Sequence, residues 1–169
     1  MSGSLCVADA SALYEMCRQI AEPKHPEFLE GLNRAMKKGC LGFPREVADD
    51  LSVIARDEPI WAWASGQRGR LDDFAGDIGQ MRPLMGLVRD LGFPNGIESL
   101  DGRENCLSSI GCLCLHLEEQ GKKFVVATED FGEAPLRPTM EQIANRKGWT
   151  VISATETLGV LNLRHLLSD

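Results

Sequence analysis

Short, continuously apolar segments separated by helix-like segments constrain this chain more than any other feature. Four such segments are each too short to be a helix: residues 4–8, 40–44, 124–127 and 149–154. No Asn-Gly type of turn joins two of them as a hairpin. Apolar strands of this kind are typical of a mainly parallel sheet that helices cover on both faces. The sequence therefore predicts a three-layer α/β/α fold with a mainly parallel central sheet.

Helices are expected where apolar residues recur at helical spacing and where Pro and Gly mark the ends. The expected helices are residues 11–20, 27–38, 44–55, 72–92, 105–120, 139–147 and 155–167. A further helix end and a loop are expected within residues 58–71. A chain of 169 residues suits one domain, so residues 1–169 are expected to fold as a single unit.

Charge and cysteine spacing exclude several classes of protein. The formal net charge of −7 argues against a surface built for tight nonspecific nucleic-acid binding, but it suits a pocket of carboxylates around a divalent cation. The six cysteines form no CxxC pair and the three histidines are scattered, which argues against zinc. No apolar run approaches the ~20 residues of a membrane span, and no signal peptide is evident, so a cytoplasmic protein with no membrane partner is expected.

Acidic residues follow the expected strands. Asp9 comes directly after the first strand, Glu46 begins the helix after the second, and Glu129 and Asp130 follow the third. Parallel strands end at one edge of the sheet, where ligands collect. Clustered carboxylates repel one another unless a divalent cation neutralises them, and oxygen ligands suit Mg²⁺ or Mn²⁺. We therefore predict that Asp9, Glu46 and Asp130 are metal ligands.

Each acid also has an ordinary structural explanation. Asp9 is well placed to cap the following helix, and Glu46 is an acid in a first helical turn, where the helix dipole favours it. Asp130 could be a simple loop residue. The joint pattern carries more information than any one of the three.

Four sequence blocks resemble those of PIN-domain proteins. They are CVADASAL (6–13), FPREVADDL (43–51), KKFVVATEDF (122–131) and GWTVISATETL (148–158). The blocks occur in the family's order and extend over residues 5 to about 160. The long middle of the chain most resembles a divergent, PIN-like branch.

The resemblance implies a metal-dependent ribonuclease. It assigns Asp9 and Glu46 to the metal site and Asp130 to the family's late acid, with Ser11, Thr128 and Glu129 in supporting positions. It also implies an RNA substrate. Similarity to the toxins of bacterial toxin–antitoxin pairs implies an antitoxin protein as a partner, and a homodimer.

The chain departs from the family at the central acid, which should lie at the start of the helix before the third strand. Counting back from Gly121 leads to Ser109, and a longer helix leads to Asn105, with Glu104 adjacent. Asp101 lies four residues before Asn105. A missing acid would weaken metal binding. The alternative is therefore a catalytically degenerate PIN-like module that binds a protein or RNA without cleaving it.

Two further patterns have simpler explanations. Trp61 and Trp63, near Arg68 and Arg70, could stack on RNA, but packing against the core is favoured. An aspartate after the first strand also occurs in aspartyl-nucleophile phosphatases and in receiver domains. Those phosphatases usually have a second aspartate two residues later, where this chain has Ser11, and the order of acids in a receiver does not match.

Overall fold

The protein is an α/β structure built on one parallel sheet, as the sequence predicts. The computed structural model describes residues 4–67, 69–93, 106–134 and 137–167. The strands are β1 (Leu5–Ala8), β2 (Leu41–Gly42), β3 (Phe124–Ala127) and β4 (Val151–Ile152). They lie in the order β2-β1-β3-β4, and all neighbours are parallel.

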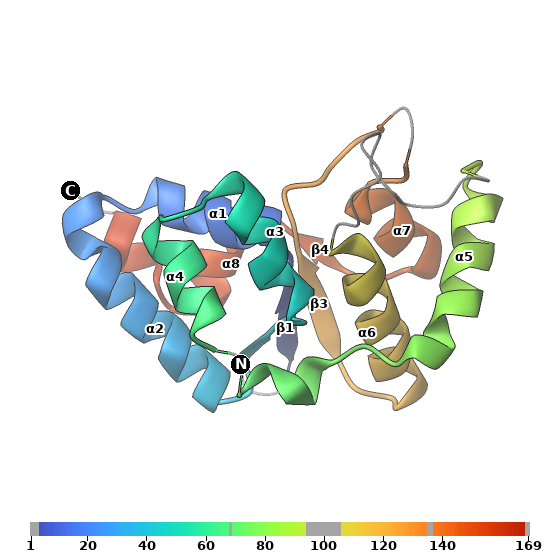
Figure 1. Ribbon diagram of the computed structural model, residues 1–169, viewed down its shortest axis with the longest axis horizontal. Helices are drawn as coiled ribbons and strands as arrows, with labels where there is room; N and C mark the ends of the chain where they lie inside the picture. The colour runs from blue at the N-terminus through green and yellow to red at the C-terminus, as the bar shows by residue number, and fades with distance from the viewer. Residues whose placement is uncertain (1–3, 68, 94–105, 135–136, 168–169) are drawn as a thin grey trace.

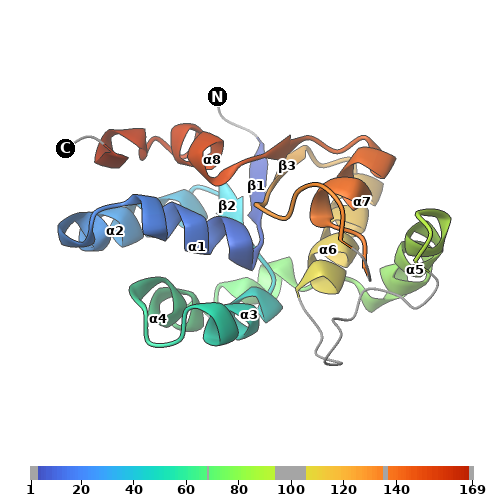
Figure 2. The same ribbon diagram turned by 90° about the horizontal axis from the view of Figure 1, so that it is seen from above.

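Helices cover both faces of this sheet. They are α1 (Ala10–Gln19), α2 (His25–Lys37), α3 (Glu46–Ile54), α4 (Pro59–Ser65), α5 (Met81–Asp90), α6 (Leu107–Glu119), α7 (Met140–Lys147) and α8 (Ala154–Val160). Helices α1, α2, α4 and α8 lie on one side, and α5, α6 and α7 lie on the other (Figures 1 and 2). The result is the three-layer α/β/α arrangement. Within the described residues, no helix has the length and apolar character that a membrane crossing requires.

The strand register brings the ends of three strands to the same level. Ala8 of β1 is opposite Ala127 of β3, which in turn is opposite Ile152 of β4. Beyond this row, the Asp9 N–H donates to the Ala127 carbonyl at 3.1 Å, and the Thr128 N–H donates to the Ile152 carbonyl at 3.1 Å. Asp9 and Thr128 are therefore neighbours at the carboxyl edge of the sheet.

The buried side chains form a hydrophobic core on both sides of the sheet. Trp63 belongs to it, because its ring centroid lies 5.7 Å from that of Phe43 and its Nε1–H donates to Asn33 at 2.8 Å. This confirms the core interpretation for Trp63, while Trp61 is half-buried against the core.

The expected helix over residues 72–92 is wrong in its first half. The chain there forms two short 3₁₀ turns, Leu71–Phe74 and Ile78–Gln80, and α5 begins only at Met81. Pro83 explains the late start, because a proline is tolerated in a first helical turn, where its missing N–H has no helical partner.

The last helix is also shorter than predicted. Helix α8 ends at Val160, and a separate 3₁₀ turn covers Arg164–Leu167. Asn162 adopts a left-handed conformation (φ 60°), and the Leu163 N–H donates to the Leu158 carbonyl at 2.8 Å. This is a Schellman ending formed by asparagine instead of the usual glycine, and apolar periodicity does not reveal it.

The Phe74 ring packs directly on Gly42 of β2. A Cβ atom at Gly42 would lie 2.3 Å from Phe74 Cε1, so one of the two must move. We expect Gly42→Ala to lower the free energy of unfolding by about 1–3 kcal/mol through overpacking, as measured by urea denaturation. Adding Phe74→Leu should recover part of the loss.

Gly86→Ala is the matched control. Gly86 lies in α5, and an added Cβ there meets nothing within 4 Å. It should raise stability by about 0.5–1 kcal/mol through helix propensity. Equal effects of the two substitutions would contradict the close approach of Phe74.

Candidate functional site

Asp9 is the central residue of the carboxyl edge. Its Oδ1 accepts hydrogen bonds from the Ala12 N–H at 2.9 Å and from the Ser11 hydroxyl at 2.7 Å. Its Oδ2 accepts a hydrogen bond from the Thr128 hydroxyl. Asp9 is thus the N-cap of α1, which confirms the capping interpretation. Capping uses only one of these three bonds, so it does not exhaust the role of the carboxylate.

Burial makes the Asp9 charge costly. The residue is only 6% exposed, and desolvation raises its pKa from 3.8 to about 6. Hydrogen bonds from Ser11, Thr128 and Ala12 lower the pKa in part, while the charge of Asp130 raises it. The ionised Asp9 carboxylate is therefore destabilised by burial, although three groups donate hydrogen bonds to it.

Ser11 and Thr128 connect Asp9 to the segment that follows β3. The Ser11 hydroxyl accepts from the Glu129 N–H at 2.9 Å while it donates to Asp9. The Thr128 hydroxyl, fully buried, accepts from the Asp130 N–H at 2.9 Å while it donates to Asp9. The two hydroxyl groups place residues 128–130 against the carboxylate. The structure thus brings five of the predicted residues together: Asp9, Ser11, Thr128, Glu129 and Asp130.

Asp130 is paired with a cation that the sequence analysis did not single out. Arg137 donates to both carboxylate oxygens, at 2.8 Å from Nη1 to Oδ2 and 3.3 Å from Nη2 to Oδ1. The Met140 N–H, at the start of α7, also donates to Oδ2 at 2.8 Å. The two-bond ion pair and the helix start together neutralise the charge of Asp130 and hold Arg137 and the start of α7 against it.

Glu129 links the exits of two strands. Its Oε2 accepts from the Ala154 N–H at 2.9 Å, at the first residue of α8 after β4. The carboxylate therefore holds the start of α8 against the end of β3. The contact is structural, and the predicted supporting role of Glu129 in a functional site stays a prediction.

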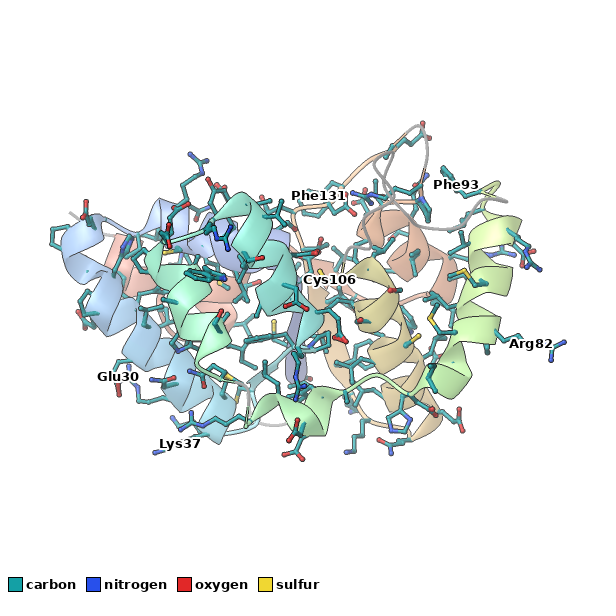
Figure 3. The ribbon with its side chains drawn as sticks, in the orientation of Figure 1. Glu30, Lys37, Arg82, Phe93, Cys106 and Phe131 are labelled. Atoms are coloured by element: carbon teal, nitrogen blue, oxygen red, sulfur yellow. The ribbon has the colours of Figure 1, made fainter. Side chains whose placement is uncertain are left out.

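A second carboxylate reaches the site from α3. The Cys106 N–H, at the N-cap of α6, donates to Asp50 Oδ2 at 2.7 Å. Burial raises the pKa of the Cys106 thiol well above its usual value, and the charges of Asp9 and Asp50 raise it further. The Cys106 thiol therefore stays protonated, and α3 contacts this residue through the hydrogen bond from its N–H to Asp50. Figure 3 shows Cys106 at the end of α6 nearest the strand exits.

The structure places Glu46 differently from Asp50. Glu46 is the exposed first residue of α3, and no described hydrogen bond or ion pair connects it to Asp9 or Asp130. Asp50 lies one turn later, between the buried residues Val47 and Leu51, and is half-buried. Helical periodicity was the signal that could have identified Asp50, because it places Asp50 nearer the apolar face.

The segment in which the family's central acid is expected is described only in part. Ser109 lies in the first turn of α6. Asp101, Glu104 and Asn105 lie outside the described residues. The residue that begins the described part of this segment is Cys106, whose N–H donates to Asp50.

The side chains of the described residues suit only a cation that takes most of its ligands from water or substrate. Among residues 4–67, 69–93, 106–134 and 137–167, no three His, Cys, Asp or Glu side chains gather closely enough to hold a metal by themselves. Mg²⁺, however, usually binds through one or two carboxylates and completes its shell with water and substrate phosphates. Asp9 and Asp50 are the two candidate carboxylates for such a site, whereas Asp130 is already paired with Arg137.

Comparisons with known proteins do not add a function. No family model matches the sequence, and no curated protein is a significant match to it. The function must therefore be argued from the site itself.

Asp9→Asn should change how stability depends on pH. A raised pKa means that the folded state favours protonated Asp9, so this contribution is full below pH 4 and is lost as the pH rises through about 6. At about 1.4 kcal/mol per pKa unit, the loss is about 3 kcal/mol. Asparagine carries no charge at any pH. The stability of Asp9→Asn relative to the natural protein should thus increase by about 3 kcal/mol between pH 4 and pH 7.5.

Urea denaturation of both proteins at the two pH values measures this difference. Asp72→Asn is the control for loss of one negative charge, because Asp72 is exposed and pairs with Arg45 at the surface. If the difference in unfolding free energy between Asp9→Asn and the natural protein did not depend on pH, the raised pKa of Asp9 would be wrong.

Arg137→Ala should loosen the segment between β3 and α7. The variant removes the two-bond ion pair of Asp130. Because both side chains are partly exposed, we expect the free energy of unfolding to fall by about 1–2 kcal/mol. Arg137→Lys keeps the charge but not the two parallel bonds, so it should recover only part of this. Hydrogen exchange of the Gly132 and Met140 amides measures the local effect. Unchanged protection in Arg137→Ala would argue against an anchoring role.

Proposed function

We propose that this protein is a metal-dependent endoribonuclease in which Asp9 and Asp50 hold a Mg²⁺ or Mn²⁺ ion. The observation that carries the proposal is the buried Asp9 carboxylate at the strand-exit edge, together with Asp50 of α3, which accepts a hydrogen bond from the Cys106 N–H at 2.7 Å. Ligands bind at this edge in parallel α/β sheets. The resemblance to PIN-domain proteins supports the same reaction.

The chain's own residues would prepare the site in three ways. Ser11 and Thr128 fix the orientation of the Asp9 carboxylate, since each donates to a different oxygen. A cation would also relieve the cost of the buried Asp9 charge. Asp130, held by Arg137, positions the β3–α7 segment and is not needed as a ligand. The cation, when bound, would polarise the phosphate and lower the pKa of an attacking water.

The assignment of ligands differs here from the prediction made from sequence. Glu46 and Asp130 were predicted as ligands beside Asp9; we now propose Asp50 in the role given to Glu46. The toxin role, an antitoxin partner, a homodimer and a cytoplasmic location remain part of the proposal, and they rest on the resemblance and the sequence alone.

A specific observation favours a second candidate, the degenerate PIN-like binding module. The Arg137 fork already neutralises Asp130, and the described residues offer no group of three metal ligands. A protein of this kind would bind RNA or a protein at the same edge without hydrolysis.

RNA cleavage with ligand variants separates the candidates. Natural protein should cleave a mixed-sequence single-stranded RNA with Mn²⁺ or Mg²⁺ and not with EDTA. Asp9→Asn and Asp50→Asn should each reduce the rate at least about a hundredfold, a loss that even outer-shell substitutions at metal sites can reach. Glu46→Gln, the matched control on α3, should retain near-natural activity.

Two outcomes would change the assignment. If Glu46→Gln lost activity and Asp50→Asn kept it, the ligand assignment would revert to Glu46. If folded natural protein cleaved nothing with either metal, the binding module would replace the nuclease. Circular dichroism of each variant confirms that lost activity is not lost structure.

A further inference from the structure

We propose that Phe131 and Arg137 form a contact site for the nucleic acid, with one unpaired base stacked on Phe131 and the neighbouring phosphate facing Arg137. The inference deepens the proposed function and rests on it for the position of the reacting phosphodiester. Phe131 was not identified from the sequence as a site residue.

Phe131 is exposed at a position where hydrophobic packing does not require it. It is 41% exposed, and it is the one aromatic residue among the large exposed hydrophobic side chains of the described residues, which are Val53, Ile54, Ile78, Phe131 and Val160. Single exposed apolar residues are ordinary on protein surfaces. Phe131 differs because it directly follows Asp130, whose N–H donates to Thr128 at the strand-exit edge.

The backbone around Phe131 is anchored on both sides. The Phe131 N–H donates to the Glu129 carbonyl at 3.1 Å. The Gly132 N–H donates to the Glu141 carboxylate at 2.8 Å, and the Gly132 carbonyl accepts from the Thr139 hydroxyl at 2.9 Å. Gly132 has a left-handed conformation (φ 76°), which glycine adopts without strain. An aromatic ring on such a fixed turn loses little backbone freedom when a ligand stacks on it.

Arg137 is the residue that would contact the phosphate next to the stacked base. Within the described residues, three of its five N–H donors are used, two on Asp130 and one on the Pro138 carbonyl. The remaining donors belong to a guanidinium that is already held in place, and its side chain is 28% exposed. A fixed guanidinium with free donors is suited to a phosphate oxygen.

The combination favours a single strand over a duplex. Stacking on a side chain needs a base whose face is not covered by a neighbour, and single-stranded sites provide such bases. The net charge of −7 argues against tight nonspecific binding of a duplex by its backbone. Recognition of a nucleic-acid strand at this site therefore depends on local contacts, and Phe131 provides the apolar contact.

The test is binding of a fluorescein-labelled 12-nucleotide RNA, measured by fluorescence anisotropy in EDTA so that no cleavage occurs. Phe131→Ala should weaken binding about five- to a hundredfold, the range expected for loss of one stacked base. Phe131→Trp should bind at least as well as the natural protein. Ile78→Ala is the matched control, because Ile78 is 85% exposed and also apolar. It should leave binding unchanged.

Single-stranded DNA and an RNA duplex of the same sequence complete the experiment. The single-stranded DNA should show the same dependence on Phe131, and the duplex should bind more weakly without that dependence. Equal binding by Phe131→Ala and the natural protein would overturn the proposal, and so would equal losses for single strand and duplex, or no binding of the single strand by the natural protein.

Cleavage kinetics distinguish this inference from the proposed function. Phe131→Ala should raise KM with little change in kcat, whereas Asp9→Asn should reduce kcat. Binding that depends on Phe131 without any cleavage would retain the inference and remove the nuclease. Cleavage that requires Asp9 but has the same KM in Phe131→Ala would retain the nuclease and remove the inference.

Discussion

The Asp9 carboxylate joins three parts of the fold at one buried point. It follows β1, caps α1 through the Ala12 N–H, and accepts the Thr128 hydroxyl at the end of β3. Thr128 and Ser11 in turn hold the next two backbone N–H groups of the β3 exit. The path of the chain from β3 toward α7 therefore depends on this carboxylate, and so do the positions of Glu129, Asp130 and Phe131.

The fold was largely predictable because short apolar strands and periodic helices are local signals. The strand over 124–127 and the helix over 139–147 agree closely with the sequence pattern. The errors came from conformations that periodicity does not encode. Asn162 ends α8 in a left-handed turn, and the chain before Pro83 forms 3₁₀ turns instead of a long helix.

The site was predictable only where it lies on the sheet. Residues directly after β1 and β3 meet because the strands are parallel neighbours, so the approach of Asp9 to the end of β3 followed from the pattern, whereas Ser11 and Thr128 were assigned by the family resemblance. Asp50 depends on the rotation of α3 about its own axis, and Arg137 depends on the path of a loop. Neither is set by strand order, so the sequence pattern singled out Glu46, the first residue of α3, and did not single out Asp50 or Arg137.

A capping role explains the hydrogen bond of Asp9 to Ala12, but it does not explain the charge. Asparagine and serine cap helices about as well as aspartate, and neither has an ionised form to desolvate. Three donors leave the Asp9 pKa still raised to about 6, so the anion is a net cost in this position near neutral pH. The described cation nearby, Arg137, bonds to Asp130 and not to Asp9. The cost of this buried charge therefore supports the proposed divalent cation, which would neutralise Asp9.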